Sequence, residues 1–396
     1  MSLLVLLSLS TPFAFHVFLP SLPGLAQTFD APPAMAQLTV SLYLAAFAFS
    51  QLAYGPLSDK FGRRRTILAG LVIYMVAPVI CTSADSIEAL AFGRALQAVG
   101  ACAGLTFARV IARDLHERDR AAGMIGFMTM LTALATSVTP LLGGYLDAWL
   151  GWRAGLWTTT GLGALVFIAT YLWLPETRPS GAIRGFGRTI LDGVRLLRSG
   201  AFIGHAGHAT CTLSAWYAAL AGLPFVMVEV LDQPQTAFGI YYPILSVGYM
   251  LGNLVTSRVA RSWGIDRLII VGAGVAILSC VPMYLWCALA TPVPLALFVP
   301  IGLVALGQGI SQPGAQSAAF GVRPDVAGSA AGIMGFVQWL VAAAASQLVG
   351  MSQDGTVWPV IHFVTFFSVL SLIFYVLARW SEAREQGTSS EPEGRS

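Results

Sequence analysis

Charged side chains are scarce in this chain of 396 residues. Aspartate, glutamate, lysine and arginine make up 10% of it, whereas soluble globular chains carry about 25%. The net charge is only +3, and the cations are dispersed among loops, so nothing indicates a nucleic-acid partner. Hydrophobic residues make up 56%, and this composition predicts an integral membrane protein.

Signatures of catalysis and of cofactor binding are also missing. The sequence has no glycine-rich loop followed by Lys-Ser/Thr that would cradle a phosphate, so an ATP-driven pump has no support. Serine, histidine and aspartate are scattered and no pair of carboxylates marks an active site, so we predict no enzyme and no cofactor. The five cysteines lie in apolar runs without metal-ligand spacing, and we expect them to be small buried residues with no metal site.

Long apolar runs separated by short polar segments are what the chain does contain. A helix of about 20 residues crosses a bilayer core of about 30 Å. The predicted spans lie near residues 3–26, 36–57, 66–83, 87–108, 121–142, 154–174, 202–227, 238–256, 268–289, 294–318, 327–349 and 357–378. The predicted fold class is therefore an all-α integral membrane protein with twelve transmembrane helices.

A compact charged stretch at residues 55–65 separates the second and third spans. We interpret it as a hairpin loop, because Gly55 and Gly62 permit tight turning. By the positive-inside bias, Lys60 and the three arginines at 63–65 mark the cytoplasmic side. Most other cations then fall on the same side, which assigns both termini to the cytoplasm and the protein to the cytoplasmic (inner) membrane. A solvated loop that only sets topology is the alternative interpretation.

Internal repetition divides the chain in two. Residues 121–128 (AAGMIGFM) resemble residues 330–337 (AAGIMGFV), and residues 252–264 are similar to the 55–65 stretch with its acid lost. Parallel repeats predict two pseudo-symmetric six-helix halves around a central cavity. The predicted units are a first half at 1–175, a cytoplasmic linker at 176–200, a second half at 201–380 and a disordered cytoplasmic tail at 381–396. Within the linker, residues 188–198 suit a helix that lies on the membrane surface.

Three motifs resemble those of major facilitator superfamily transporters. Gly-x-Leu-x-Asp-x-x-Gly-Arg-Arg at 55–64 is similar to the loop between the second and third helices of that family. Arg-x-Leu-Gln-x-x-Gly, beginning at Arg94, resembles the fourth-helix motif, whose arginine takes part in proton coupling. The fifth span carries Pro140, Gly143 and Gly144 as in the antiporter motif, but Thr139 stands where that motif has glycine. This departure weakens the inference that the chain is an antiporter but does not exclude it.

Shorter matches narrow the resemblance to drug-resistance transporters of the Bcr/CflA type, which includes bicyclomycin and chloramphenicol/florfenicol exporters. These matches lie at residues 18–23, 37–43, 51–56, 112–114, 151–153 and 175–178. The resemblance implies export of small drugs in exchange for protons by alternating access. We expect a monomer whose partners are the drug, protons and the bilayer. The alternatives are uptake, export of a native metabolite by the same fold, and a receptor that binds without transport.

The candidate site residues fall into three groups. Asp59, Arg63 and Asp114 are expected to form a cytoplasmic charge cluster that stabilises the outward-facing arrangement. Arg94 is expected to face the cavity and respond to the coupled proton, with a snorkelling arginine as the alternative. The candidates for contacts with the drug are Gln37, Tyr43, Gln97, Trp216, Tyr217 and Tyr249. For any one aromatic side chain, packing in the core or against lipid is the alternative.

His16 departs from the branch that the chain resembles, whose members usually carry aspartate there. We predict that His16 takes up and releases the coupled proton, because an unperturbed histidine titrates at about pH 6.5. A neutral histidine hydrogen-bonded in the helix packing is the alternative. A protonated His16 beside Arg94 would disfavour cationic drugs and favour neutral ones. His205 and His208, three residues apart at the start of the seventh span, favour an interfacial role.

Overall fold

Long apolar helices dominate the structure, a computed structural model of the chain. It describes residues 2–115, 118–176 and 193–389, and for residues 2, 109, 113–115, 118–123, 125 and 385–389 it describes the backbone alone. Within this part of the chain, 12 helices are long and apolar enough to cross a membrane. Each of them coincides with one of the predicted spans, which confirms the fold class.

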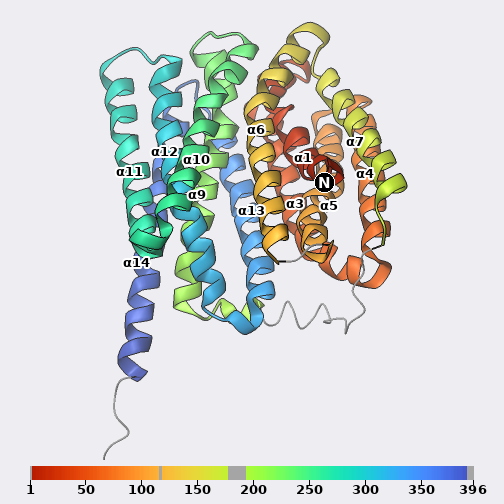
Figure 1. Cartoon of the computed structure of the whole chain (residues 1–396). Helices are drawn as coiled ribbons and strands as arrows, with labels where there is room; N and C mark the ends of the chain where they lie inside the picture. The colour runs from red at the N-terminus through yellow and green to blue at the C-terminus, as the bar shows by residue number, and fades with distance from the viewer. Residues whose placement is uncertain (1, 116–117, 177–192, 390–396) are drawn as a thin grey trace, which may run out of the picture.

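The helices form two groups that stand side by side (Figure 1). The first half comprises α1 (Ser2–His16), η1 (Leu19–Ser21), α2 (Leu22–Thr28), α3 (Pro33–Phe61), α4 (Arg63–Thr82), α5 (Ile87–Leu115), α6 (Arg118–Leu150) and α7 (Arg153–Trp173). The second half comprises α9 (Gly200–Phe225), η2 (Val226–Val230), α10 (Gln235–Trp263), α11 (Ile265–Leu289), α12 (Pro294–Gly321), η3 (Pro324–Val326), α13 (Ala327–Met351) and α14 (Trp358–Ser389). The first span contains α1, η1 and α2, and the seventh contains α9 and η2.

Backbone conformation repeats between the halves. The described residues with positive φ occur at turns, and they form three pairs almost equally far apart in the chain. The pairs are Asp30 (47°) with Asp232 (51°), Gly62 (90°) with Gly264 (78°), and Gly151 (79°) with Gly355 (76°). Positive φ is costly for most residues and free for glycine. The turns at equivalent places in the two halves therefore adopt the same unusual backbone conformation. This repetition is what two pseudo-symmetric halves require.

The stretch at residues 55–65 is not the compact hairpin loop that the sequence predicts. Helix α3 continues through Pro56 to Phe61, and α4 begins at Arg63, so Gly62 alone separates them. The Gly62 N–H still donates to the Ser58 carbonyl, at 2.9 Å. The prediction was wrong because helices extend beyond the hydrocarbon layer, where long cationic side chains reach water.

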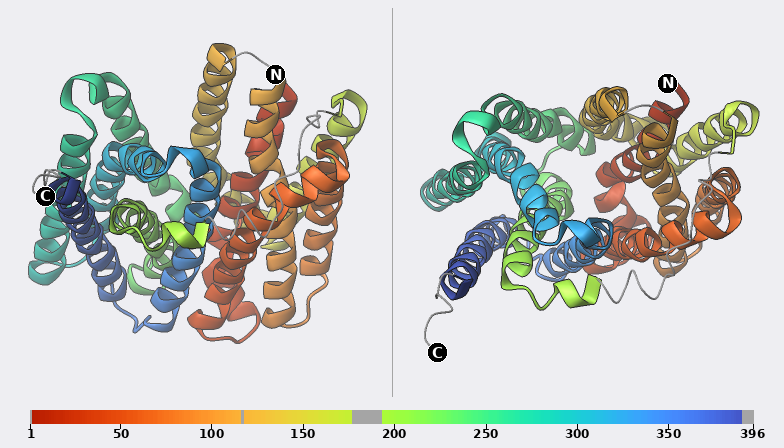
Figure 2. Two further views of the ribbon diagram at one scale, coloured as in Figure 1. Left: turned by 90° about the horizontal axis from the view of Figure 1, so that it is seen from below. Right: turned by 60° about the horizontal axis from the view of Figure 1, so that its bottom comes forward.

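Two faces of the bundle are named here by their turns. The Gly62 face carries the turns at Gly62 and Gly264, and the Asp30 face carries those at Asp30 and Asp232. Between the halves, α3 packs along α13, and α6 packs along α10; Figure 2 shows α13 beside α3, seen from the Gly62 face. These two helix pairs form the seams between the halves.

The predicted linker and tail fall partly within the described residues. Residues 193–196 are helical, and Leu196 is buried against the second half, whereas residues 177–192 lie outside the described residues. Helix α14 continues to Ser389, so the polar tail predicted as disordered from residue 381 begins as helix. Residues 390–396 lie outside the described part of the chain.

Candidate transport site

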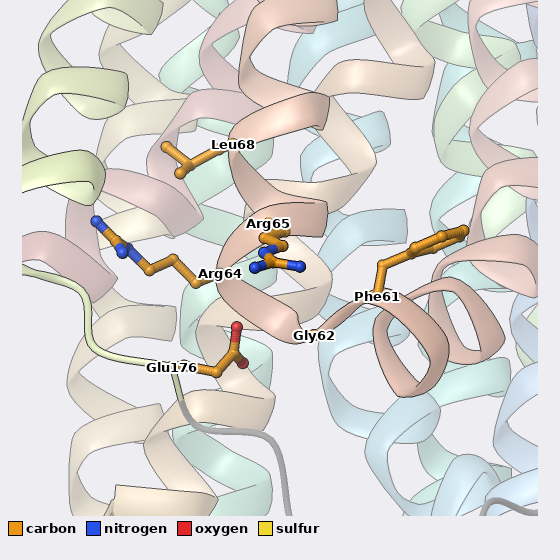
Figure 3. Close-up of a pocket in the computed structure, with 6 residues that line it drawn as sticks. All are labelled: Phe61, Gly62, Arg64, Arg65, Leu68 and Glu176. Atoms are coloured by element: carbon orange, nitrogen blue, oxygen red, sulfur yellow. The ribbon is translucent and has the colours of Figure 1, made fainter.

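A charge cluster surrounds the turn at Gly62. The backbone N–H of Arg63 donates to Oε1 of Glu176 at 2.9 Å, and the charges of Asp59 and Glu176 stabilise the Arg63 guanidinium. Figure 3 shows Glu176 next to Gly62 at this turn. A β-carbon at Gly62 would lie 2.6 Å from Oε2 of Glu176, so this position needs glycine for space as well as for φ.

This cluster differs in membership from the predicted one. Asp59 and Arg63 are brought together, but the side chain of Asp114 lies outside the described residues. Glu176 is the carboxylate that the prediction missed. The sequence did indicate this residue, because Glu176 belongs to the motif at residues 175–178 that directly follows the sixth span.

Arg94 occupies the interior of the first half and has no exposed surface. Its Nη1 donates to the Ala14 carbonyl at 3.1 Å and also to Oε1 of Gln97. The guanidinium carbon lies 4.2 Å from the ring centroid of Phe18 and 4.6 Å from that of Tyr43. The side chain is therefore directed into the bundle and does not reach water at the helix end.

The Arg94 charge has no carboxylate partner among the described residues. Nε and Nη2 are buried and lack a hydrogen-bond acceptor there, and the groups that act on the guanidinium charge are tyrosines and a cysteine. Nε and Nη2 form one edge of the planar guanidinium, which matches an acceptor group with two oxygens. An uncompensated buried charge is costly, so this edge is suited to a ligand.

Gln97 positions this arginine. Its Nε2 donates to Oγ1 of Thr159 at 3.0 Å, which fixes the amide and turns its oxygen toward Arg94. The contact links α5 to α7, and Thr159 was not among the predicted site residues. The hydroxyl of Tyr43, beside the guanidinium, is buried without a partner among the described residues. Tyr43 and Gln97 therefore lie where the sequence analysis expects them, next to Arg94.

His16 ends helix α1 and lies between the halves. Its exposed fraction is 5%, and its Nδ1 lies 3.3 Å from the hydroxyl of Tyr242 on α10. Helix α1 ends at this point, and prolines follow at positions 20 and 23 in the first turns of η1 and α2, where the missing N–H of proline is tolerated. The imidazole is thus placed at a break in the first span and in contact with the opposite half.

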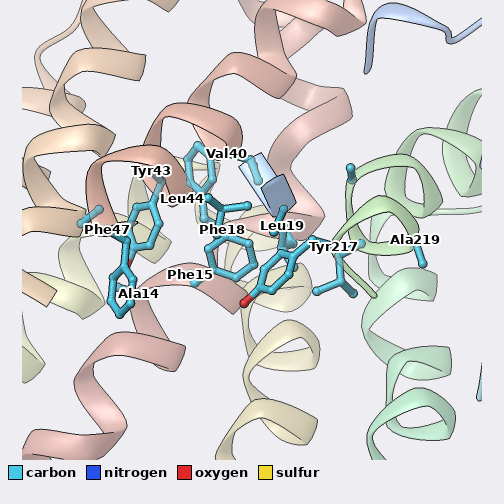
Figure 4. Packing of buried hydrophobic residues seen from close by; sticks show 14 of the residues in the cluster. Ala14, Phe15, Phe18, Leu19, Val40, Tyr43, Leu44, Phe47, Tyr217 and Ala219 are labelled. Atoms are coloured by element: carbon cyan, nitrogen blue, oxygen red, sulfur yellow. The ribbon is translucent and has the colours of Figure 1, made fainter. Parts of the chain in front are cut away.

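Aromatic rings from five helices surround these polar groups. This central aromatic cluster comprises Phe15, Phe18, Tyr43, Phe47, Trp216, Tyr217, Tyr242, Tyr249 and Trp339. Phe15 and Tyr217, from different halves, have ring centroids 5.3 Å apart, and Figure 4 shows them next to each other. Such rings supply flat apolar contacts and a few polar tips, which suits a lipophilic ligand. Trp216, Tyr217 and Tyr249 of the predicted cavity residues belong to this cluster.

Gln37 lies elsewhere, in the seam between α3 and α13 toward the Asp30 face. Its Nε2 donates to Oγ of Ser346 at 2.5 Å. Nearby, Ser41 donates to Gln347 at 2.6 Å, and Gln347 donates to the Ala34 carbonyl at 3.1 Å. These hydrogen bonds join the two halves, so Gln37 closes a seam and does not belong to the central aromatic cluster.

Of the glycines of the fifth-span motif, Gly143 packs against the first span of its own half and Gly144 lies in the other seam. A β-carbon at Gly143 would lie 2.1 Å from the Val17 carbonyl oxygen, and one at Gly144 would lie 3.1 Å from Cα of Thr236. On α10, a β-carbon at Gly239 would lie 2.5 Å from Cα of Leu141. Close approach of α6 to α1 and α10 therefore depends on these glycines. Pro140 lies within α6 one turn before Gly143. Gly55, in contrast, has open space at its β-position.

His205 and His208 are remote from this site. His205 Nε2 lies 2.8 Å from Oε1 of Glu382, and His208 Nδ1 lies 3.0 Å from the Ser371 carbonyl. Both imidazoles are buried between α9 and α14. They therefore do not share a pocket with His16 and Arg94.

The chain matches the Major Facilitator Superfamily over residues 4–346 and belongs to that family. It is a membrane transporter and not an enzyme. It is 23% identical over 388 residues to a bicyclomycin resistance protein homolog of Haemophilus influenzae, covering 96% of each chain. It is 26% identical over 376 residues to a chloramphenicol resistance protein of Pseudomonas aeruginosa, covering 94% of this chain and 88% of that one.

The fold is also that of a solved transporter. A bacterial homolog of the human lysosomal transporter Spinster, in an inward-facing and unoccupied conformation, superimposes with a TM-score of 0.77 over 96% of both chains. The sequence identity is 15%, so the likeness concerns the fold alone. The predicted fold and family are confirmed.

Proposed function

We propose that this transporter exports small, neutral, lipophilic drugs across the cytoplasmic membrane in exchange for protons. The observation that carries the proposal is the joint burial of Arg94 and His16 beside aromatic rings that come from both halves. Relatives named for resistance to bicyclomycin and to chloramphenicol support a drug as the substrate. We retain the predicted division into halves at residues 1–175 and 201–380.

The proton is assigned to His16. Among the described residues, this side chain brings an imidazole, a group whose unperturbed pKa lies near neutral pH, to the contact between the halves. Alternating access moves the halves relative to each other. Separation of α1 from α10 would break the contact with Tyr242 and change the surroundings of the imidazole. Its affinity for a proton would then differ between the two states, which is the requirement for coupling.

The charge of the site selects the drug. Arg94 is permanently charged, and a protonated His16 adds a second positive charge nearby, so a cationic drug would be repelled. A neutral drug with an oxygen acceptor could bind the open edge of Arg94 while its apolar part contacts the aromatic cluster. The binding pocket would exclude water, which strengthens the hydrogen bonds to the guanidinium.

The Gly62 face is assigned to the cytoplasm, together with both termini. Cations on the turns and helix ends of this face support the assignment, because positive residues are retained in the cytoplasm. The hydrogen bonds between α3 and α13 close the Asp30 face, which fits a state that opens inward. We propose that the Asp59, Arg63 and Glu176 cluster, with Asp114, stabilises the opposite state.

The test is a drug-susceptibility panel in cells that lack their own pumps, followed by transport in proteoliposomes. Export predicts raised resistance to neutral drugs and counterflow of labelled drug. An imposed proton gradient should accelerate drug movement, and drug movement should release protons. Absence of counterflow for every drug that binds would contradict transport of drugs by this chain.

Export of a native organic acid is the second candidate. The observation that favours it is the edge of Arg94 without a carboxylate partner, because a substrate carboxylate would complete the ion pair. Paired substrates that differ only in carboxylate against primary amide distinguish the two. Faster counterflow of the carboxylate would favour the organic acid, and faster counterflow of the amide would favour neutral drugs.

A further inference from the structure

Two adjoining cavities lie on the outside of the first half, away from the transport site. One, of about 310 Å³, is bordered by Arg64, Arg65 and Glu176 at the turn after α3. The other, of about 460 Å³, runs between α3, α4 and α5. Phe61 and Arg65 line both. The second cavity, named the α3–α4 groove here, thus adjoins a basic pocket at its end.

The α3–α4 groove is apolar and has the depth of one lipid leaflet. Its lining extends along α3 from Phe61 to Ser50, which is about 16 Å at 1.5 Å per residue. Half of a bilayer core is about 15 Å. Small side chains at Ala53, Ala69 and Gly70 leave the space open. The length and lining fit one acyl chain that enters from the Gly62 face.

The floor of the groove separates it from the transport site. Tyr54 is buried there and donates to the Val99 carbonyl at 2.8 Å, and its ring packs against Phe107. Leu57 and Phe61, at the rim, are 39% and 52% exposed. The groove is therefore open toward lipid and closed toward the centre, which argues against a path for the drug.

The basic pocket at the end of the groove has an excess of positive charge. Arg64 is held by a hydrogen bond of 2.7 Å to the Tyr171 carbonyl, and its Nε is buried without a partner among the described residues. Arg65 is exposed, and Lys60 lies 5.1 Å from the ring centroid of Phe61. Among the described residues that line this pocket, the single carboxylate is Glu176, which already accepts from the Arg63 N–H. Phosphate is the group that arginine pairs bind best.

We propose that this site binds one anionic glycerophospholipid. Its phosphate lies between Arg64 and Arg65, and one acyl chain fills the α3–α4 groove. Basic pockets at the membrane surface recognise anionic headgroups, and a neutral lipid would gain from the groove but not from the arginines. The lipid would bridge α3 and α4 beside the charge cluster at Gly62.

Native mass spectrometry of the full chain in mild detergent tests the proposal. Equimolar phosphatidylglycerol and phosphatidylcholine with identical acyl chains are the probes. We expect about a 25-fold preference for phosphatidylglycerol, since each of the two arginines near the surface contributes a factor of about five. The double variant Arg64→Gln/Arg65→Gln should lose this preference. Arg261→Gln, at the end of α10 on the same face, is the matched control and should keep it.

A second variant tests the groove itself. Ala53→Phe fills it, so retention of both lipids should fall several-fold while the elution volume of the protein stays unchanged. Equal binding of the two lipids to the unmodified chain, or an undiminished preference in the double variant, would overturn the headgroup assignment. Unchanged retention by Ala53→Phe, or displacement of phosphatidylglycerol by a transported drug, would overturn the assignment of the groove to an acyl chain.

Discussion

The hydroxyl of Tyr242 lies 3.3 Å from Nδ1 of His16, and this contact joins the first span to α10 of the opposite half. Both side chains are almost fully buried. A titratable group placed at a moving interface experiences two environments during one transport cycle. We therefore propose this pair as the point where proton binding and the movement of the halves are coupled.

The first prediction concerns His16. His16→Ala and His16→Gln should reduce proton-driven drug export at least tenfold, and His16→Asp should restore coupling with a pH profile displaced toward acid, because a carboxylate ordinarily titrates about two units lower. The measurement is drug transport into inside-out vesicles between pH 5.5 and 8. His362→Gln, an exposed histidine packed between Trp358 and Tyr284, is the control.

An unchanged proton-driven rate in His16→Ala would remove His16 from the mechanism. Attention would then move to Asp30, to Glu229 or to the pair His205 and His208. Tyr242→Phe provides an independent check, because it deletes the hydroxyl and keeps the ring. It should displace the pH profile while the amount of bound drug stays similar.

The second prediction concerns Arg94. Arg94→Ala should abolish exchange of drug for protons, by at least tenfold in rate, while drug binding is retained through the aromatic cluster. Arg94→Lys keeps the charge but loses the flat edge of the guanidinium, so it should give intermediate exchange and weaker binding of acceptor-bearing drugs. Tryptophan fluorescence, which reports on Trp216 and Trp339, measures binding, and counterflow measures exchange. Normal exchange in Arg94→Ala would leave Arg94 a structural role only.

The sequence was sufficient to predict the spans, the family and the inward direction of Arg94. Apolar run length decides whether a helix crosses the bilayer, and the cost of a buried charge decides which way an arginine points. Both are local properties. The end of α3 was mispredicted because hydrophobicity marks the edge of the hydrocarbon layer, whereas the hydrogen-bonded helix continues to Phe61.

Contacts between the halves were not predictable from local patterns. Gln37 was expected in the cavity, yet its partner is Ser346 in the opposite half. Nothing in the sequence near either residue indicates the other as its partner, because this hydrogen bond depends on how two helices far apart in the chain pack together. The contact of His16 with Tyr242 has the same origin. Glu176, in contrast, lies in the motif at residues 175–178, so its functional role could have been predicted from the sequence.

The third prediction concerns the charge cluster at Gly62. Asp59→Asn should lower export about fivefold or more with little change in the amount of protein in the membrane, because it removes a charge that stabilises Arg63. Glu176→Gln should have a smaller effect, since an amide oxygen can still accept from the Arg63 N–H. Export assays normalised to membrane protein give the comparison, with Glu88→Gln, exposed at the other end of the bundle, as the control. Export at the wild-type rate by Asp59→Asn would contradict the proposed role.

The fourth prediction concerns the seam between α6 and α10. Gly239→Ala, on α10, places a β-carbon 2.5 Å from Cα of Leu141 on α6, whereas Gly161→Ala, on α7, meets nothing within 4 Å. Overpacking of this kind costs about 1–3 kcal/mol, and the cost is paid only while the Asp30 face is closed. Gly239→Ala should therefore shift the population toward states open on that face and slow export about tenfold or more.

Spin labels at Thr28 and Asp354, which are exposed at the Asp30 face on different halves, measure that shift by electron paramagnetic resonance. We expect a longer mean distance between the labels in Gly239→Ala than in the unmodified chain. Gly161→Ala is the matched control, because it adds the same methyl group in open space. If the two variants gave the same distance distribution and the same export rate, close packing at Gly239 would not control the closure of this face.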